Sequence, residues 1–107
     1  MATILQVNFT WDLSEAERDE HFTLDIARRL ANFPGLRWKV WLTDEDTKGA
    51  GGIYLFDDRQ SAQARVDALR PILEGLPGTS DISMRMFDIR EDLSEITRAP
   101  IGEPTAA

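Results

Sequence analysis

The sequence contains no cysteine, a single histidine and no long uninterrupted run of apolar residues. The lack of cysteine excludes disulfides, thiolate metal sites and a cysteine nucleophile, and it fits a reducing cytoplasm. One histidine excludes a metal centre built from several histidines of one chain. Without a run of about 18 apolar residues we expect no membrane span. A strand pattern begins directly after Met1, so we also expect no signal peptide.

Basic residues are scarce as well, with 12 lysines and arginines against 19 acidic residues and a net charge of −7. This balance disfavours nucleic acid as a partner, because binding to phosphates needs a basic surface. The acidic run 44–46 lacks the glycine and the downstream glutamate of a calcium loop, so we interpret it as a solvated turn. The glycines of 49–52 lack the lysine of a phosphate-binding loop. We therefore predict neither a metal nor a bound cofactor.

The length of 107 residues, with 42% hydrophobic and 29% charged residues, is typical of one soluble domain with one core. Apolar periodicity predicts strands over 3–11, 36–43, 51–56 and 81–89, and helices over 14–33 and 58–76. A short helical turn is expected over 92–98. We predict a single domain over 1–99 and a flexible C-terminal tail over 100–107, which is rich in proline, glycine and alanine.

Several local signals set the ends of these elements. Ser14 and Glu17 form the pattern of a capping box, and Asp58 and Asp92 are expected to cap the later helices. Pro71 cannot donate a backbone hydrogen bond, so the second helix should kink or restart near Arg70. Paired glycines at 51–52 indicate a bulge or a close backbone approach in the third strand.

The predicted order β-α-β-β-α-β indicates an α+β fold of ferredoxin-like arrangement. Right-handed crossovers then give a four-stranded antiparallel sheet with both helices on one face. The other face stays uncovered and partly apolar, with Trp41, Phe87 and Ile89 expected on it. An open apolar face predicts association, and the simplest closed solution is a twofold homodimer packed sheet to sheet.

Large aromatic side chains gather on one predicted hairpin. Two of the three tryptophans lie in the segment Arg37-Trp38-Lys39-Val40-Trp41, and the only tyrosine lies in Ala50-Gly51-Gly52-Ile53-Tyr54-Leu55-Phe56. Tryptophan and tyrosine combine an apolar body with a polar group. Such a cluster either fills a core or lines a pocket for a flat organic molecule.

The sequence resembles the YdhR family of monooxygenases in these two segments and in residues 2–9, 34–36, 86–89 and 92–96. This family belongs to the dimeric α/β-barrel group, near the antibiotic-biosynthesis monooxygenases. The resemblance covers nearly the whole chain in order, while the helices match only in pattern. It implies a homodimeric, cofactor-independent monooxygenase that acts on an aromatic, phenolic or quinol-like small molecule in a hydrophobic pocket. In that chemistry the substrate supplies its own electrons to oxygen. A non-catalytic carrier or sensor for a hydrophobic small molecule, and a purely structural dimer, are the alternatives.

Three candidate pocket residues come from the second predicted strand. Alternation places Trp38 toward the helices, either in the core or as a pocket wall. Trp41 then faces the opposite way, in dimer packing or against a ligand. Lys39 lies beside Trp41 and either forms a salt bridge or stabilises an anion.

Four further candidates come from other elements. The Tyr54 hydroxyl could hold a phenolic oxygen, or Tyr54 could pack across the strands with its hydroxyl in water. Asn8 could orient a ligand or bond across the dimer. Arg85 could counter an anion, although an ion pair is the simpler expectation. His21 is the only side chain that titrates near neutral pH by default, and we expect it to be exposed. No catalytic residue is assigned from the sequence.

Overall fold

The computed structural model describes residues 1–102 and has the predicted order of elements. They are β1 (Thr3–Trp11), α1 (Glu15–His21), α2 (Leu24–Ala31), β2 (Leu36–Asp44), β3 (Gly49–Phe56), α3 (Arg59–Gly75), β4 (Thr79–Asp88) and α4 (Glu91–Ile96). The four strands form one antiparallel sheet in the order β2-β3-β1-β4. The predicted ferredoxin-like α+β architecture is therefore confirmed.

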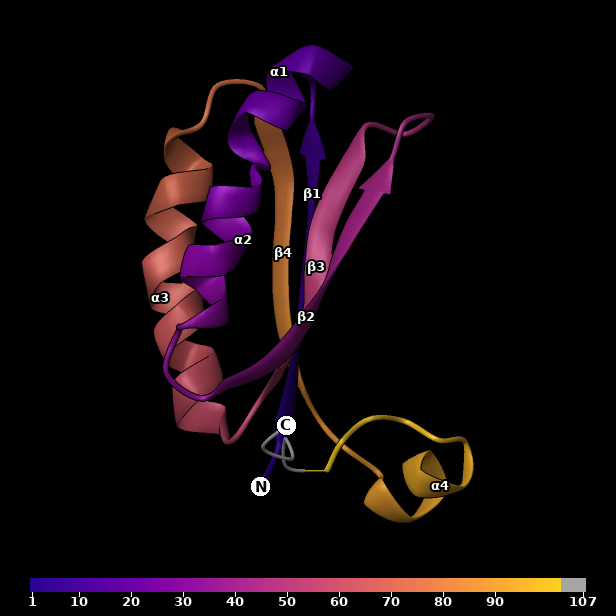
Figure 1. Ribbon diagram of the computed structural model, residues 1–107. Helices are drawn as coiled ribbons and strands as arrows, with labels where there is room; N and C mark the ends of the chain where they lie inside the picture. The colour runs from indigo at the N-terminus through magenta and orange to yellow at the C-terminus, as the bar shows by residue number, and fades with distance from the viewer. Residues whose placement is uncertain (103–107) are drawn as a thin grey trace.

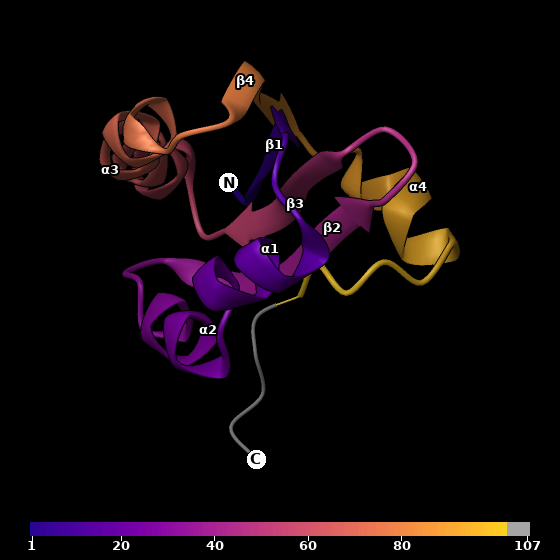
Figure 2. The ribbon, with the colours of Figure 1, turned by 90° about the horizontal axis from the view of Figure 1, so that it is seen from above.

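The helices α2 and α3 cover one face of the sheet, and α4 lies on the opposite side (Figures 1 and 2). The core fills the space between the helices and the sheet. The inward side chains of β1 are buried, and so are those of α3 that face them. The β1 set is Leu5, Val7, Phe9 and Trp11; the α3 set is Ala62, Val66, Leu69 and Leu73. Among residues 1–102, no helix is both long and apolar enough to cross a bilayer.

The predicted helix over 14–33 is wrong in one respect, because it is divided into α1 and α2. The capping box at its start is confirmed, with Ser14 and Glu17 bonding reciprocally. A second start follows at Thr23, whose side chain accepts a hydrogen bond from the Ile26 amide. Threonine favours such caps because its hydroxyl satisfies an amide that the helix leaves unpaired. The break lets α1 lie over the end of β1 while α2 runs along the sheet.

The later helices depart from two of the predicted signals. Asp58 caps α3 as expected, by accepting from the Ser61 amide, but α3 then continues through Pro71 without a restart. At α4 the cap is Arg90 rather than Asp92, and no side-chain cap bond is formed. A proline inside a helix removes one hydrogen bond and crowds the carbonyl one turn earlier, a cost that the packing of the α3 apolar stripe outweighs here.

An irregularity at Arg37 reverses the predicted faces of β2. Leu36 pairs with Phe56 and Trp38 pairs with Leu55, so Arg37 is the extra residue of a bulge. From that point Lys39 and Trp41 face the helices, and Trp38 faces the open side of the sheet. The predicted orientations of Trp38 and Trp41 are therefore both wrong, because simple alternation assumes an unbroken register.

The third strand remains in register through its paired glycines, so the predicted feature there is a close approach and not a bulge. A Cβ atom on Gly51 would lie 1.9 Å from the carbonyl oxygen of Val7. The neighbouring Gly52 leaves room for a side chain instead: its Cβ would lie 2.5 Å from Cε of Lys39. These glycines form part of the floor beneath Lys39 and Trp41.

The segment after α4 returns to the open side of the sheet. The Trp38 indole donates a hydrogen bond to the Pro100 carbonyl at 2.8 Å, and Arg37 donates one to the Ile101 carbonyl at 3.0 Å. Residues 100–102 thus contact β2 at the start of the predicted tail. Residues 103–107 of that tail lie outside the described part of the chain.

Candidate functional site

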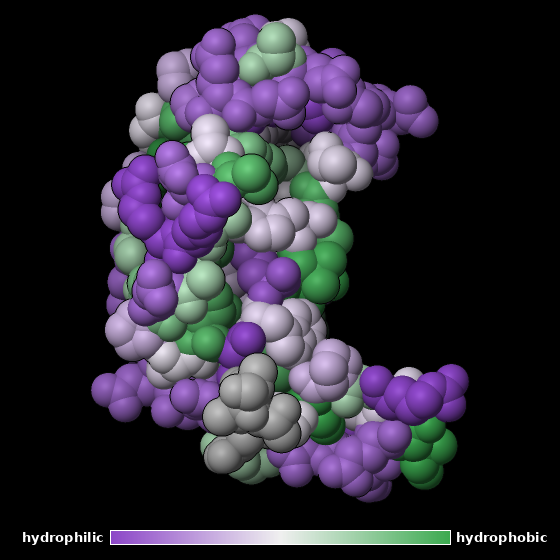
Figure 3. Space-filling view, viewed as in Figure 1, coloured by the Kyte–Doolittle hydropathy of each residue, from purple (hydrophilic) through white to green (hydrophobic). Residues whose placement is uncertain are grey.

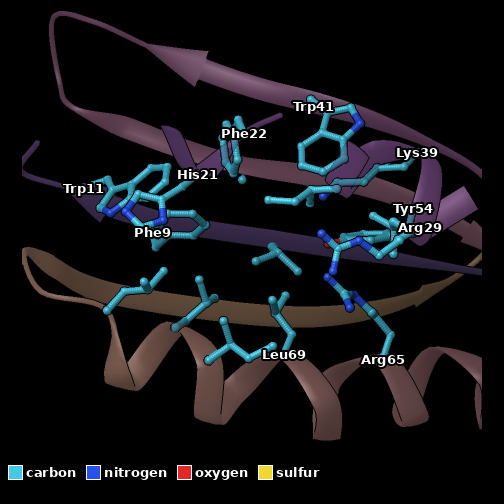
Figure 4. Close-up of a pocket in the computed structure, with 17 residues that line it drawn as sticks. Phe9, Trp11, His21, Phe22, Arg29, Lys39, Trp41, Tyr54, Arg65 and Leu69 are labelled. Atoms are coloured by element: carbon cyan, nitrogen blue, oxygen red, sulfur yellow. The ribbon is translucent and has the colours of Figure 1, made fainter. Parts of the chain in front are cut away.

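A cavity of about 350 Å³ lies between the sheet and the helices (Figure 4). This volume falls in the lower part of the range of ligand pockets, roughly 300–1,000 Å³. Its walls are mainly apolar and aromatic. The aromatic lining consists of Phe9, Trp11, Phe22, Trp41 and Tyr54, and aliphatic side chains from α2 and α3 complete it. The arrangement suits a flat apolar molecule.

One end of the cavity is aromatic because α1 and α2 meet β1 there. Trp11 packs against Phe22 with 4.9 Å between ring centroids, and Phe22 packs edge-on against Trp41 at 5.2 Å. The turn between α1 and α2 places Phe22 in this position. The Trp11 indole nitrogen is buried and has no hydrogen-bond partner among residues 1–102, which is uncommon for a buried donor.

The other end carries the polar groups of the cavity. The ammonium of Lys39 lies 3.3 Å from the centroid of the Trp41 ring and 4.5 Å from that of Tyr54. The guanidinium carbon of Arg65, on α3, lies 5.8 Å from the Tyr54 ring centroid. Arg29 of α2 also lines the cavity, and the labelled side chains of this end converge in Figure 4.

Burial shifts the proton affinities of two of these groups. Desolvation, assisted by the nearby positive charge of Arg65, lowers the pKa of Lys39 from 10.5 to about 7. Burial raises the pKa of Tyr54, and Arg65 opposes that rise in part. At neutral pH the cavity therefore holds a tyrosine that keeps its proton and a lysine amine that can both release and accept one.

The structure brings four of the seven predicted residues to this cavity: His21, Lys39, Trp41 and Tyr54. His21 is exposed as expected, but its ring lies 5.4 Å from that of Trp11, at the rim.

The other three predicted residues lie on the open face of the sheet. Each of them is paired with a residue of the neighbouring strand. Trp38 pairs with Leu55, Asn8 with Gly51 and Arg85 with Gln6. The expected ion pair of Arg85 is not found among residues 1–102; its guanidinium carbon lies 5.2 Å from the centroid of Phe87. Trp38 and Tyr54 lie on opposite faces of the sheet, because the Arg37 bulge shifts the register between β2 and β3.

Sequence reasoning missed the two arginines of the cavity, Arg29 and Arg65. Each directly neighbours a buried apolar residue of its helix, Leu30 and Val66 respectively. A position beside a buried residue is a sequence signal that the arginine could reach the cavity. Arginines that flank a buried apolar stripe commonly extend to solvent, however, so the signal is weak. In residues 1–102, no group of three or more histidine, cysteine or acidic side chains is placed to hold a metal.

The fold and the cavity define a ferredoxin-like α+β protein with an aromatic pocket between sheet and helices. Comparison with protein families finds a match over residues 4–100 to the family described as "Putative mono-oxygenase ydhR". The match covers nearly the whole chain, and the chain belongs to this family. The comparison with curated proteins found no match.

Proposed function

We propose that the protein is a cofactor-independent monooxygenase that oxidises an aromatic phenol or quinol in this cavity. The family supplies the class of reaction. The observation that carries the proposal is the position of Lys39, a lysine with a pKa of about 7 held over two aromatic rings at the wall of an apolar cavity. A lysine with a pKa near the working pH is suited to act as a general base.

The substrate ring would lie among the aromatic walls, with its hydroxyl toward Lys39. Trp41 and Phe22 offer flat surfaces for stacking, which excludes water from the reacting atoms. In its neutral form Lys39 would accept the phenolic proton. The ammonium so formed would then lie beside the phenolate and stabilise its charge, in a setting where charges are poorly screened. Tyr54 keeps its proton and could donate a hydrogen bond to a ligand oxygen.

Oxidation would draw its electrons from the substrate itself. The phenolate passes one electron to O2, and the two radicals combine through a new carbon–oxygen bond. The peroxide so formed takes the proton back from Lys39, and the O–O bond breaks as the ring hydrogen and the hydroxide leave together as water, which gives the quinone. For a naphthol the balance is C10H8O + O2 → C10H6O2 + H2O. One oxygen atom enters the product and the other leaves as water, so no external reductant is required.

Oxygen uptake with 1-naphthol tests the proposal. We expect quinone formation by protein that has been freed of flavin and treated with chelator, at a rate well above that of buffer. An absolute need for added flavin or metal would contradict the mechanism. Ligand binding without any oxygen uptake would instead indicate the carrier or sensor alternative.

We further propose that the protein forms a homodimer through the open face of the sheet. On that face Val40 and Phe87 are exposed, and so are Leu93 and Ile96 of α4. Figure 3 shows the molecular outline hollowed on this side, between the β2–β3 turn and α4. A second sheet would fill the hollow and cover apolar surface. Sedimentation at micromolar concentration should report about twice 12.1 kDa; a monomer at that concentration would contradict the interface.

We also propose that the protein is cytoplasmic, since a chain without cysteine suits a reducing compartment.

A further inference from the structure

The charges around the cavity have one sign. Arg29, Lys39 and Arg65 line it, and none of its 17 lining residues is acidic. The whole chain has the opposite bias, with 19 acidic residues against 12 basic ones. The two arginines, with Arg65 half-buried and Arg29 exposed at the wall, create a local positive potential to which the protonated form of Lys39 adds, and this potential favours an anionic ligand.

Two of these cations differ from the other shielded cations of the molecule. Arg18 and Arg37 are each paired with a carboxylate, Glu45 and Asp57 respectively. Lys39 and Arg65 are half-buried and have no carboxylate partner within residues 1–102. Burying a charge without a partner is costly, and an anionic ligand would supply the missing partner.

The arginine is also left with an unsatisfied donor. The Nε atom of Arg65 is buried and has no hydrogen-bond acceptor in the described chain. Its guanidinium is held 5.6 Å from the Phe33 ring centroid and 5.8 Å from that of Tyr54, so neighbouring rings fix its position. Leaving a buried donor unpaired costs free energy that a ligand acceptor would recover.

Lys39 and Arg65 also repel each other, since the charge of Arg65 is one cause of the lowered pKa of Lys39. An anion between or beside them would relieve that repulsion. The remaining walls are aromatic and aliphatic, so the anion must be attached to a flat apolar body. Guanidinium groups match a carboxylate through two parallel hydrogen bonds.

We propose that the cavity selects aromatic acids: the ligand is a hydroxyaryl carboxylate whose carboxylate is bound by Arg65 and Arg29 and whose hydroxyl faces Lys39. The inference rests on the proposed function in taking this cavity as the substrate site, and it adds the substrate class. It does not require that oxidation takes place.

The test compares three ligands with related ring systems under anaerobic conditions: 1-hydroxy-2-naphthoate, its methyl ester and 1-naphthol. Isothermal titration calorimetry should show the acid binding at least about 10-fold more tightly than the ester, which is the size of effect that one charge-assisted pair provides. Arg65→Met should remove this preference and keep the ester affinity within about 3-fold, because methionine retains the packing. Arg70→Met, at an exposed position of α3 that does not line the cavity, should leave the preference unchanged.

Two further variants guard against a folding defect in Arg65→Met. Arg29→Met should reduce the preference for the acid. Arg65→Lys should retain part of it, since lysine keeps the positive charge but cannot form the two parallel hydrogen bonds of a guanidinium. Equal affinity for acid and ester in the unaltered protein would overturn the inference, as would a preference that survives Arg65→Met, or no binding of any of the three. Oxygen uptake with 1-naphthol separates the two proposals: oxidation without acid preference leaves the proposed function standing, and acid preference without oxidation leaves this inference standing.

Discussion

The two faces of the sheet carry similar side chains in different environments. On the helix side, Lys39 lies over Trp41 inside a cavity, and its pKa falls to about 7. On the open side, Arg85 lies over Phe87 in an exposed position, and Trp38 bonds to the Pro100 carbonyl. A cation over an aromatic ring therefore occurs on both faces, and on the helix side desolvation lowers the pKa of that cation. The enclosing helices, more than the residue types, define the candidate site.

The sharpest test of this contrast removes the charged group from each face in turn. Lys39→Met should lower oxygen uptake by roughly 100- to 10,000-fold, the usual contribution of a general base. Arg85→Met should leave uptake unchanged. In the unaltered protein, kcat/KM should rise through pH about 7, because below that pH Lys39 is protonated and cannot accept the phenolic proton. Uptake within a few fold of normal in Lys39→Met would remove Lys39 from the mechanism.

The open face should instead respond to charge as an interface does. Val40→Glu places a charge in the proposed apolar interface and should raise the dimer dissociation constant about 100-fold, since burying an unpaired charge is costly. Leu24→Glu makes the same change at an exposed position on the helix side and serves as the control. Sedimentation velocity over a dilution series measures both variants, and an unaltered dimer in Val40→Glu would place the interface elsewhere.

Much of the fold was predictable because it depends on local chemistry and periodicity. The strand order follows from the order of elements and crossover handedness, and Ser14 and Asp58 cap their helices as the sequence indicates. The break at Thr23 had a signal, a capping residue with Asp25 in the following turn, but the apolar stripe on both sides of it favours one longer helix.

The site was only partly predictable, because one bulge decides which aromatic residues meet. The sequence around Arg37 does not distinguish a bulge from regular strand pairing. Simple alternation of side chains therefore places Trp38 and Trp41 on the wrong faces of the sheet. Lys39 and Tyr54 were identified by residue type and neighbourhood. Arg65 was not, since its role depends on the packing of α3 against the sheet.

The paired glycines of β3 allow the site to be disturbed separately from the sheet. In Gly52→Ala the new methyl group would meet Cε of Lys39 at 2.5 Å, and this flexible side chain would move away from Trp41. We expect oxygen uptake to fall about 10-fold with a small loss of stability, since displacing a catalytic group by about 1 Å is costly to the rate.

Gly51→Ala is the matched comparison for that change. Its methyl group would meet the Val7 carbonyl at 1.9 Å, so the backbone itself must shift. We expect the free energy of unfolding to fall by about 2–4 kcal/mol, measured by urea denaturation. Equal losses of stability in the two alanine variants would show that Lys39 does not yield to the methyl group as expected.

The lowered pKa of Lys39 also predicts how stability depends on pH. Between its folded value of about 7 and its ordinary value of 10.5, the unfolded chain holds a proton that the folded chain lacks. The contribution of Lys39 to the free energy of unfolding should therefore increase as the pH rises from 7 toward 10.5. Lys39→Met should remove this increase and raise stability near pH 6 by about 1–2 kcal/mol, because a desolvated charge is lost together with a weaker cation–π contact. Thermal melts of both proteins across this pH range measure the difference, with Arg70→Met on the exposed side of α3 as the control. Parallel pH profiles would mean that Lys39 is fully hydrated.

The smallest expected effect separates the two tryptophans of β2. Trp41 lines the cavity and Trp38 does not, although only two residues separate them in the sequence. A naphthoquinone bound in the cavity should quench tryptophan fluorescence through Trp41 and Trp11. Trp41→Phe should weaken the binding of this ligand about 3- to 10-fold, because phenylalanine offers a smaller stacking surface and leaves a gap beside Phe22. Trp38→Phe should leave the affinity unchanged and lower stability by about 1 kcal/mol, since it loses the hydrogen bond to Pro100. The reverse result, with affinity lost in Trp38→Phe and retained in Trp41→Phe, would place the ligand on the open face and would contradict the assignment of the cavity as the site.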